Sequence, residues 1–305
     1  MPLILDIGEL RKLQKRRRQA KRTAALRPPA KAEILLRREA VRLWKQAIKP
    51  SLERIKEAIR REIDAEDLAL LLDEELRTLE AQYGMSAGAI VNRWRVAVDE
   101  LTREHISQAL GKTLGIDITA VLDEEPVDTA LTVASWEASN LIKTIPQELL
   151  GQVARAVTDN LRGVPLQAGR TLLQQIEHLG GVSKKRAQLI ARDQTAKLTG
   201  ELNRVRQQSI GVETYIWRTS KDERVVGNPA GKYPEGNDKH GNHYVMEGVT
   251  CKWADPTVYS LDGGKTWKKR TGEMPKTHVG IDIQCRCYGE PVVDIERIVQ
   301  MAKVA

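Results

Sequence analysis

Apolar side chains recur every three or four residues from Ile34 to about Leu161, and this periodicity constrains the fold more than any other feature. A strand would alternate with a period of two, so this half of the chain predicts long amphipathic helices that pack together. We expect the three tryptophans of this half, Trp44, Trp94 and Trp136, to lie in that core. The clearest runs are Ile48, Leu52, Ile55 and Ile59; Leu68, Leu72, Leu76 and Leu79; and Ile90, Trp94, Val98 and Leu101.

Proline and glycine mark where these helices are expected to begin and end. Pro50 should open one helix, Gly84 should close another, and the stretch from Gly111 to Pro126 should connect two. A second helical block follows, in which Gly180-Gly181 should end one helix and Ser183 should cap the next.

The pattern changes after Gly211, where short β-like runs are separated by Gly, Pro, Asn and Asp. We therefore predict the α+β class: a mostly helical N-terminal half followed by a small α+β C-terminal domain with short antiparallel strands. The expected strands are 214–220, 243–249, 257–261, 265–269 and 285–293. The expected segments are a basic N-terminal arm (1–30), a helical domain (31–162), a C-terminal α+β domain (163–295) and a C-terminal tail (296–305).

Positive charge is concentrated at the N-terminus. Residues 1–62 hold 19 Lys and Arg against 7 Asp and Glu, a balance of +12 in a chain whose formal net charge is +8, so the remainder carries −4. The arm predicts contact with nucleic-acid phosphates, and its alternative is a solvated charged helix without a partner. The expected DNA contacts are Arg11, Lys12, Lys15, Arg16, Arg17, Arg18, Lys21 and Arg22.

Neither a membrane span nor a secretory signal is expected. No apolar run approaches the roughly 20 residues that a bilayer-spanning helix needs. The opening stretch MPLILDIGEL is short, contains two acidic residues and has its basic residues after it, the reverse of a signal peptide. We expect the chain to stay in the compartment where it is made.

The stretch SLDGGKTW, residues 260–267, matches a hairpin box that occurs in sialidase-like propellers. Asp262 can accept hydrogen bonds from its own turn, and Gly263 and Gly264 can supply the positive φ angles of a tight hairpin. A propeller needs several blades, yet the box occurs once and we find no internal repeat. We therefore predict a structural turn and reject a glycosidase.

Histidines and cysteines cluster near the C-terminus. His240, His243, Cys251, His278, Cys285 and Cys287 lie within 48 positions. They suggest a zinc clamp, with His243, Cys251, His278, Cys285 and Cys287 as the candidate ligands. A C-x-C pair is unusual for a closed zinc site, so the favoured prediction is no metal and no other cofactor, with Cys285 and Cys287 as small buried residues on a strand. Arg286 between them should then face the other way and pair with a carboxylate such as Asp222.

The same cluster also allows a catalytic interpretation. Cys and His could act as nucleophile and base, or His and Asp could form a nuclease-like pair. The local sequence offers neither an oxyanion hole nor a phosphate-binding glycine loop. We therefore predict no enzymatic activity, and we keep a metal-dependent nuclease or transferase in the C-terminal domain as the alternative. A free DNA-binding regulator would need a recognition helix, which the sequence does not indicate.

The order of the motifs between Pro165 and Val293 resembles the Mu F-like phage head morphogenesis family, the minor capsid proteins of tailed bacteriophages. The helix AQLIARDQTAKL, the strand and turn GVETYIWRTSKDERV, the element HYVMEG and the closing DIQCRCYGEPV stand in that order. Asp193-Gln194 replaces the usual Thr-Glu, Gln284 replaces Asn, and 225–242 is a lengthened loop. The motif residues are Ala191, Arg192, Thr195, Trp217, Asp222, Arg224, His243, Gly248, Cys285, Arg286 and Cys287, and we add His278 as a structural residue.

The resemblance implies a virion protein that is present in few copies and is assembled in the host cytoplasm. Its expected role is structural, in head assembly and in DNA packaging or delivery. Its expected location is the portal vertex or the capsid interior. Its expected partners are the portal protein, the major capsid protein or both, and packaged DNA through the basic arm.

Overall fold

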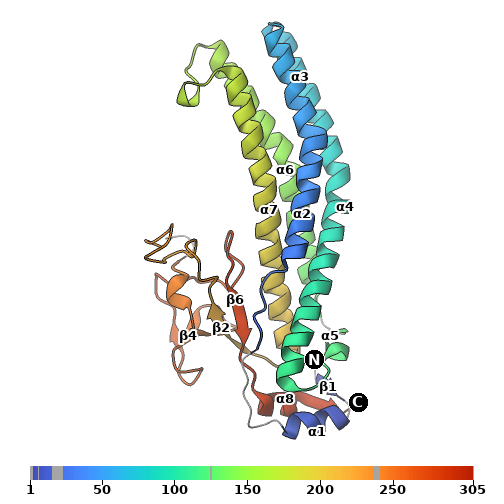
Figure 1. Ribbon diagram of the computed structural model, residues 1–305, viewed down its shortest axis with the longest axis vertical. Helices are drawn as coiled ribbons and strands as arrows, with labels where there is room; N and C mark the ends of the chain where they lie inside the picture. Colours follow the sequence, from blue (N-terminus) through green and yellow to red (C-terminus); the bar gives the residue numbers. More distant parts are fainter. Residues whose placement is uncertain (1–2, 6, 16–22, 124–125, 237–240, 305) are drawn as a thin grey trace. The chain divides into compact units, whose positions relative to one another are not determined.

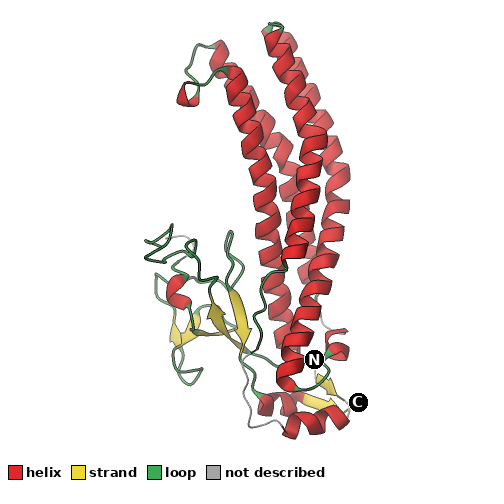
Figure 2. Cartoon of the chain, in the orientation of Figure 1, coloured by secondary structure: helices red, strands yellow, loops and turns green. Residues whose placement is uncertain are grey.

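A computed structural model describes residues 3–5, 7–15, 23–123, 126–236 and 241–304. The chain forms two compact units, and neither is continuous in sequence. One, the helical unit, comprises Ala30–Val96 and Val133–Gln194; the other, the sheet unit, comprises Met1–Pro29, Ala97–Thr132 and Thr195–Ala305. The predicted α+β class is confirmed (Figure 2). The units do not follow the four consecutive segments expected from the sequence, because the helices α4 (Ala65–Leu114) and α7 (Leu172–Ser209) each contribute to both.

The helical unit is built from helices that run alongside one another (Figure 1). Its first helical column consists of α2 (Ala30–Leu43), a π-helical turn (Trp44–Ile48) and α3 (Lys49–Arg60). The N-terminal part of α4, most of α6 (Asp128–Leu161), a 3₁₀ turn (Gln167–Gly169) and the first half of α7 complete it. The apolar periodicity becomes the core: among its buried side chains are Leu36, Ile48, Ile55, Leu79, Tyr83, Ile90, Trp94, Ile142, Ile145, Leu149, Val153 and Ile176.

Two expected helix ends are wrong. Helix α4 continues through Gly84, because buried Tyr83 and Ala87 keep its apolar face continuous on both sides of the glycine. Helix α7 continues through Gly180-Gly181. A Cβ on Gly180 would lie 2.7 Å from Leu52 Cδ1, so this glycine lets α7 approach α3 closely.

Ser183 is also not a helix cap. It lies inside α7, where its hydroxyl accepts a hydrogen bond of 2.7 Å from the Trp44 indole N–H and donates to the Gly180 carbonyl. Trp44 and Trp94 are buried as expected. Trp136 is not, because its side chain on α6 is 70% exposed.

The sheet unit contains a core in which both ends of the chain take part. The strands β1 (Leu3–Leu5) and β7 (Ala302–Val304) pair in parallel, and the helices α1 (Ile7–Lys15) and α8 (Ile295–Met301) lie beside each other (Figure 1). The end of α4 and the short helix α5 (Thr119–Asp123) add apolar side chains. Leu13 and Leu26 of the N-terminal arm are buried in this core.

A five-stranded antiparallel sheet completes the unit, in the order β5-β4-β3-β2-β6. The strands are β2 (Thr214–Arg218), β3 (Thr250–Lys252), β4 (Val258–Ser260), β5 (Lys268–Lys269) and β6 (Tyr288–Pro291). They cover a second core that contains Tyr215, Trp217, Met246, Cys251, Trp253, Val279, Cys285 and Cys287.

Two of the five expected strands are corrected. The segment 243–249, expected as a strand, contains a 3₁₀ turn (Tyr244–Met246) instead. The strand β3 begins at Thr250, directly after this segment. The last strand begins at Tyr288, so Cys285 and Cys287 precede it. Among the described residues, no helix combines the length and the apolar character that a membrane crossing requires.

Candidate functional site

Two loops of the sheet unit bring His243, Cys285 and Cys287 together. His243 lies in the connection between β2 and β3, immediately before the 3₁₀ turn. The cysteines lie immediately before β6, after a tight turn in which the Cys285 N–H donates to the Asp282 carbonyl and Gln284 has a φ of 59°. This turn directs the C-x-C segment back toward the sheet.

The three side chains converge on one point. His243 Nδ1 lies 3.5 Å from Cys285 Sγ and 3.5 Å from Cys287 Sγ. On the other side of the ring, His243 Nε2 lies 3.0 Å from Asp282 Oδ2, and the Thr277 hydroxyl donates to the same carboxylate oxygen. The carboxylate fixes the ring orientation, so that Nδ1 faces the two sulfurs.

The cluster is enclosed. His243 is 4% exposed and each of the two cysteines is 6% exposed. Trp217 on β2 packs edge-on against the imidazole, with ring centroids 5.5 Å apart. Burial of Cys285 and Cys287 is confirmed, and so is their alternation with the more exposed Arg286, although the segment lies before the strand rather than in it.

Charge in the cluster is set by mutual contacts. Burial opposes protonation of His243, but its hydrogen bonds with Asp282 and Cys285 outweigh burial and raise the pKa of the imidazole to about 10. The hydrogen bond from Cys287 and the neighbouring imidazolium hold the pKa of the Cys285 thiol well below its usual value despite burial. The contact with Cys285, together with burial, raises the pKa of Cys287. These shifts favour negative charge on the Cys285 sulfur and positive charge on the imidazole beside it.

The other two candidate zinc ligands are not part of this group. The potential metal-ligating atoms that lie within 4.8 Å of one another belong to His243, Cys285 and Cys287. Cys251 lies on β3 opposite Tyr215, and burial raises the pKa of its thiol. His278 lies beside the Tyr215 hydroxyl, with Nδ1 and the phenol oxygen 3.2 Å apart. His240 lies outside the described residues.

The predicted partner of Arg286 is confirmed. Its guanidinium contacts both carboxylate oxygens of Asp222, at 2.7 and 2.6 Å. Asp222 also accepts a hydrogen bond from the Arg224 backbone N–H. Gly248 has a φ of 82°, and its N–H donates to the Trp217 carbonyl. The strand-and-turn motif and the closing motif are therefore connected by direct contacts.

The hairpin between β4 and β5 has the geometry predicted for its box. The Asp262 carboxylate accepts hydrogen bonds from the Ser260 and Thr266 hydroxyls and from the backbone N–H groups of Lys265 and Thr266. The hydroxyls, followed by these N–H groups, hold the pKa of the carboxyl group below its usual value. Gly263 and Gly264 have φ angles of 74° and 95°. Turn geometry accounts for Ser260, Asp262, Gly263, Gly264 and Thr266.

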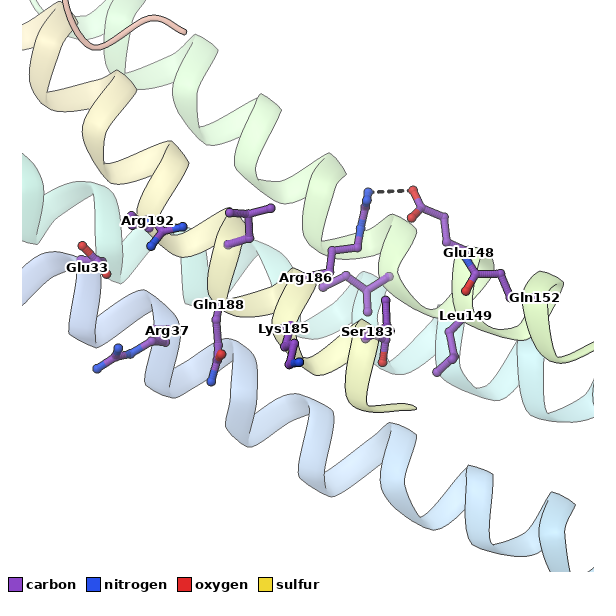
Figure 3. A pocket seen from close by; sticks show the side chains of 13 residues that line it. Glu33, Arg37, Glu148, Leu149, Gln152, Ser183, Lys185, Arg186, Gln188 and Arg192 are labelled. Atoms are coloured by element: carbon purple, nitrogen blue, oxygen red, sulfur yellow. Dashed lines mark hydrogen bonds and ion pairs between the residues drawn. The ribbon is translucent and has the colours of Figure 1, made fainter. Parts of the chain in front are cut away.

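Arg192 belongs to the helical unit, where it lines a cleft of about 530 Å³ among α2, α6 and α7. Arg37, Lys185 and Arg186 bring further positive charge to this cleft, and Arg186 donates a hydrogen bond to Glu148 across it (Figure 3).

Of the expected DNA contacts, Arg11, Lys12 and Lys15 lie on α1. Arg16, Arg17, Arg18, Lys21 and Arg22 lie outside the described residues.

Sequence reasoning missed Asp282. It stands three residues before Cys285 in HVGIDIQCRC, but nothing in the spacing shows that it hydrogen-bonds a histidine 39 positions away.

Chemically, the group formed by His243, Cys285 and Cys287 can bind a soft divalent cation or hold a thiolate next to an imidazolium. The cavity that Cys287 lines measures about 10 Å³, enough for one water molecule and too small for an organic substrate.

Comparison with known proteins adds one relative. An uncharacterized protein of Haemophilus influenzae (strain ATCC 51907 / DSM 11121 / KW20 / Rd) is 30% identical over 201 residues, which are 64% of this chain. The chain spans 37% of that protein's length. No family model and no solved structure matches the chain.

Proposed function

We propose that this chain is a minor head protein of a tailed bacteriophage, with a structural role at the portal vertex or capsid interior. The supporting observation is that motif segments far apart in the sequence meet in one small cluster. Trp217 packs on His243, His243 contacts both cysteines, and Asp222 pairs with Arg286. These contacts join the three C-terminal motif elements through which the sequence resembles Mu F-like proteins.

The enclosure of the cluster supports a structural role over a catalytic one. A nucleophile must reach its substrate, whereas His243, Cys285 and Cys287 are almost completely buried. The residues therefore define the fold of the sheet unit. Other surfaces of the chain would then contact the portal protein or the major capsid protein, and the basic arm would contact packaged DNA.

Genetic complementation tests this proposal. Removing the coding sequence from the phage should reduce the yield of DNA-filled, infectious heads, and supplying the chain in trans should restore it. The Cys285→Ala, Cys287→Ala double variant should restore less than Cys251→Ala, because Cys251 is a buried thiol outside the cluster. A normal yield of infectious heads without the chain would overturn the proposal.

A metal-dependent enzyme, a nuclease or a transferase, is the second candidate. The observation that favours it is the His-Cys-Cys group oriented by a carboxylate, an arrangement compatible with a catalytic metal. Cleavage of duplex DNA by the purified chain, abolished by His243→Ala in a folded variant, would support this class.

A further inference from the structure

We propose that His243, Cys285 and Cys287 bind one Zn²⁺ ion, which holds together two loops of the sheet unit. The proposal rests on the geometry of the donor atoms and does not depend on the proposed function. Both Nδ1–Sγ distances are 3.5 Å. In a tetrahedral site with Zn–N of about 2.0–2.1 Å and Zn–S of about 2.3 Å, the nitrogen-to-sulfur distance is about 3.6 Å. The nitrogen and each of the two sulfurs thus already stand at the spacing that the ion requires, and all three atoms lie within 4.8 Å of one another.

The surroundings of the ligands fit the same ion. A zinc-bound histidine usually donates its other ring N–H to a carboxylate, and His243 Nε2 meets Asp282, which Thr277 supports in turn. The Trp217 indole N–H is buried without a well-aligned acceptor in the described part of the chain, and the Cys287 sulfur is the group that it approaches. An N–H donor beside a metal-bound thiolate stabilises its negative charge.

Two thiolates and an imidazole favour zinc over magnesium or calcium, which prefer oxygen ligands. On binding, Cys285 and Cys287 are both thiolates and His243 Nδ1 carries a lone pair, so any protons on these atoms are released to solvent. Three protein ligands leave the fourth position to a water molecule.

A metal would stabilise the five-stranded sheet and the loops beside it, because the strands themselves are short. The strands are two to five residues long. His243 lies 42 positions before Cys285 and 44 positions before Cys287 in the chain. A metal that joins them removes much of the conformational freedom that the intervening segment has in the unfolded chain. Zinc binding would therefore add directly to the stability of the fold.

Metal content of the full chain tests the proposal. After purification in zinc-containing medium, we expect one zinc per chain by elemental mass spectrometry. Asp282→Asn should weaken zinc binding by about 10- to 100-fold, and His243→Ala, Cys285→Ala and Cys287→Ala, which remove direct ligands, should each weaken it further. Cys251→Ala is the matched control, since it removes a buried thiol of the same core and should keep the full zinc content.

A cobalt titration of the unaltered chain keeps the test independent of variants that fail to fold. Co²⁺ bound by two thiolates should give sulfur-to-metal charge-transfer absorption that saturates at one ion per chain and disappears when Zn²⁺ is added. A folded chain that binds neither ion in competition with a chelating dye would overturn the proposal. Equal loss of zinc in Cys251→Ala and Cys285→Ala would do the same.

Discussion

His278 is a partly buried histidine whose surroundings disfavour its charged form. Burial, followed by the positive charges of Arg204 and Arg270, lowers the pKa of its imidazole to about 4. An unfolded chain would bind a proton here at about pH 6.5. Between these two values the unfolded state binds more protons than the folded state, so stability falls as the pH drops through this window.

We therefore expect the urea midpoint of unfolding to fall between about pH 6.5 and pH 4, with this contribution levelling off below pH 4. The variant His278→Gln should show a shallower fall over the same range. His105→Gln, which alters an exposed histidine on α4, should keep the slope of the unaltered chain. Identical slopes for all three proteins would show that His278 is not held neutral.

Some contacts between residues follow from the sequence and others do not. Alternation along the C-x-C segment predicts that Arg286 faces away from the two thiols, and a pairing with Asp222 follows from charge. The hydrogen bond between His243 and Asp282 depends on how two long loops fold, and no local pattern encodes that. The same limit applies to Cys251 and His278, whose residue types suit zinc but which the fold places elsewhere.

Helix ends show how packing overrides local signals. Glycine usually ends a helix, yet Gly180 lies inside α7 because its missing side chain admits Leu52. Ser183 is a good capping residue, yet its hydroxyl serves the buried Trp44. Trp136 fits the apolar stripe but is exposed, since periodicity cannot tell which flank of a helix is covered.

The basic arm is the element for which we predict DNA binding. Deleting it would also remove Leu13 and Leu26, and losing buried leucines typically costs about 2–5 kcal/mol each. Changing only Arg16, Arg17, Arg18, Lys21 and Arg22 to Gln leaves these leucines in place. This variant should bind duplex DNA more weakly. The slope of the logarithm of the binding constant against the logarithm of the salt concentration should become less steep by about 0.9 for each phosphate that the arm no longer neutralises.

A matched control is a chain with five exposed basic residues of the helical unit changed to Gln: Lys45, Lys49, Arg60, Arg61 and Arg77. We expect this control to keep the salt slope of the unaltered chain in a filter-binding assay. If the affinity for DNA falls equally in both variants, the attraction comes from overall charge rather than from the arm.

At the scale of the whole molecule, the sequence predicts the fold class and carries the motifs that resemble Mu F-like proteins. The structure adds how these motifs are arranged in space. Both ends of the chain pack in the sheet unit, through β1 with β7 and α1 with α8. Such long-range pairing leaves no periodic pattern in the sequence. Periodicity alone therefore predicts domains that are consecutive segments of the chain. Convergence of the three C-terminal motif elements on one cluster supports the proposed head protein.

The location of the chain in purified particles tests that proposal most directly. DNA-filled heads of the phage that encodes the chain should be purified, cross-linked and analysed by quantitative mass spectrometry. We predict that the chain is present in far fewer copies than the major capsid protein and is cross-linked to the portal protein or to the inner face of the capsid. Its absence from heads, while it is abundant in the soluble fraction of the same lysate, would contradict the account.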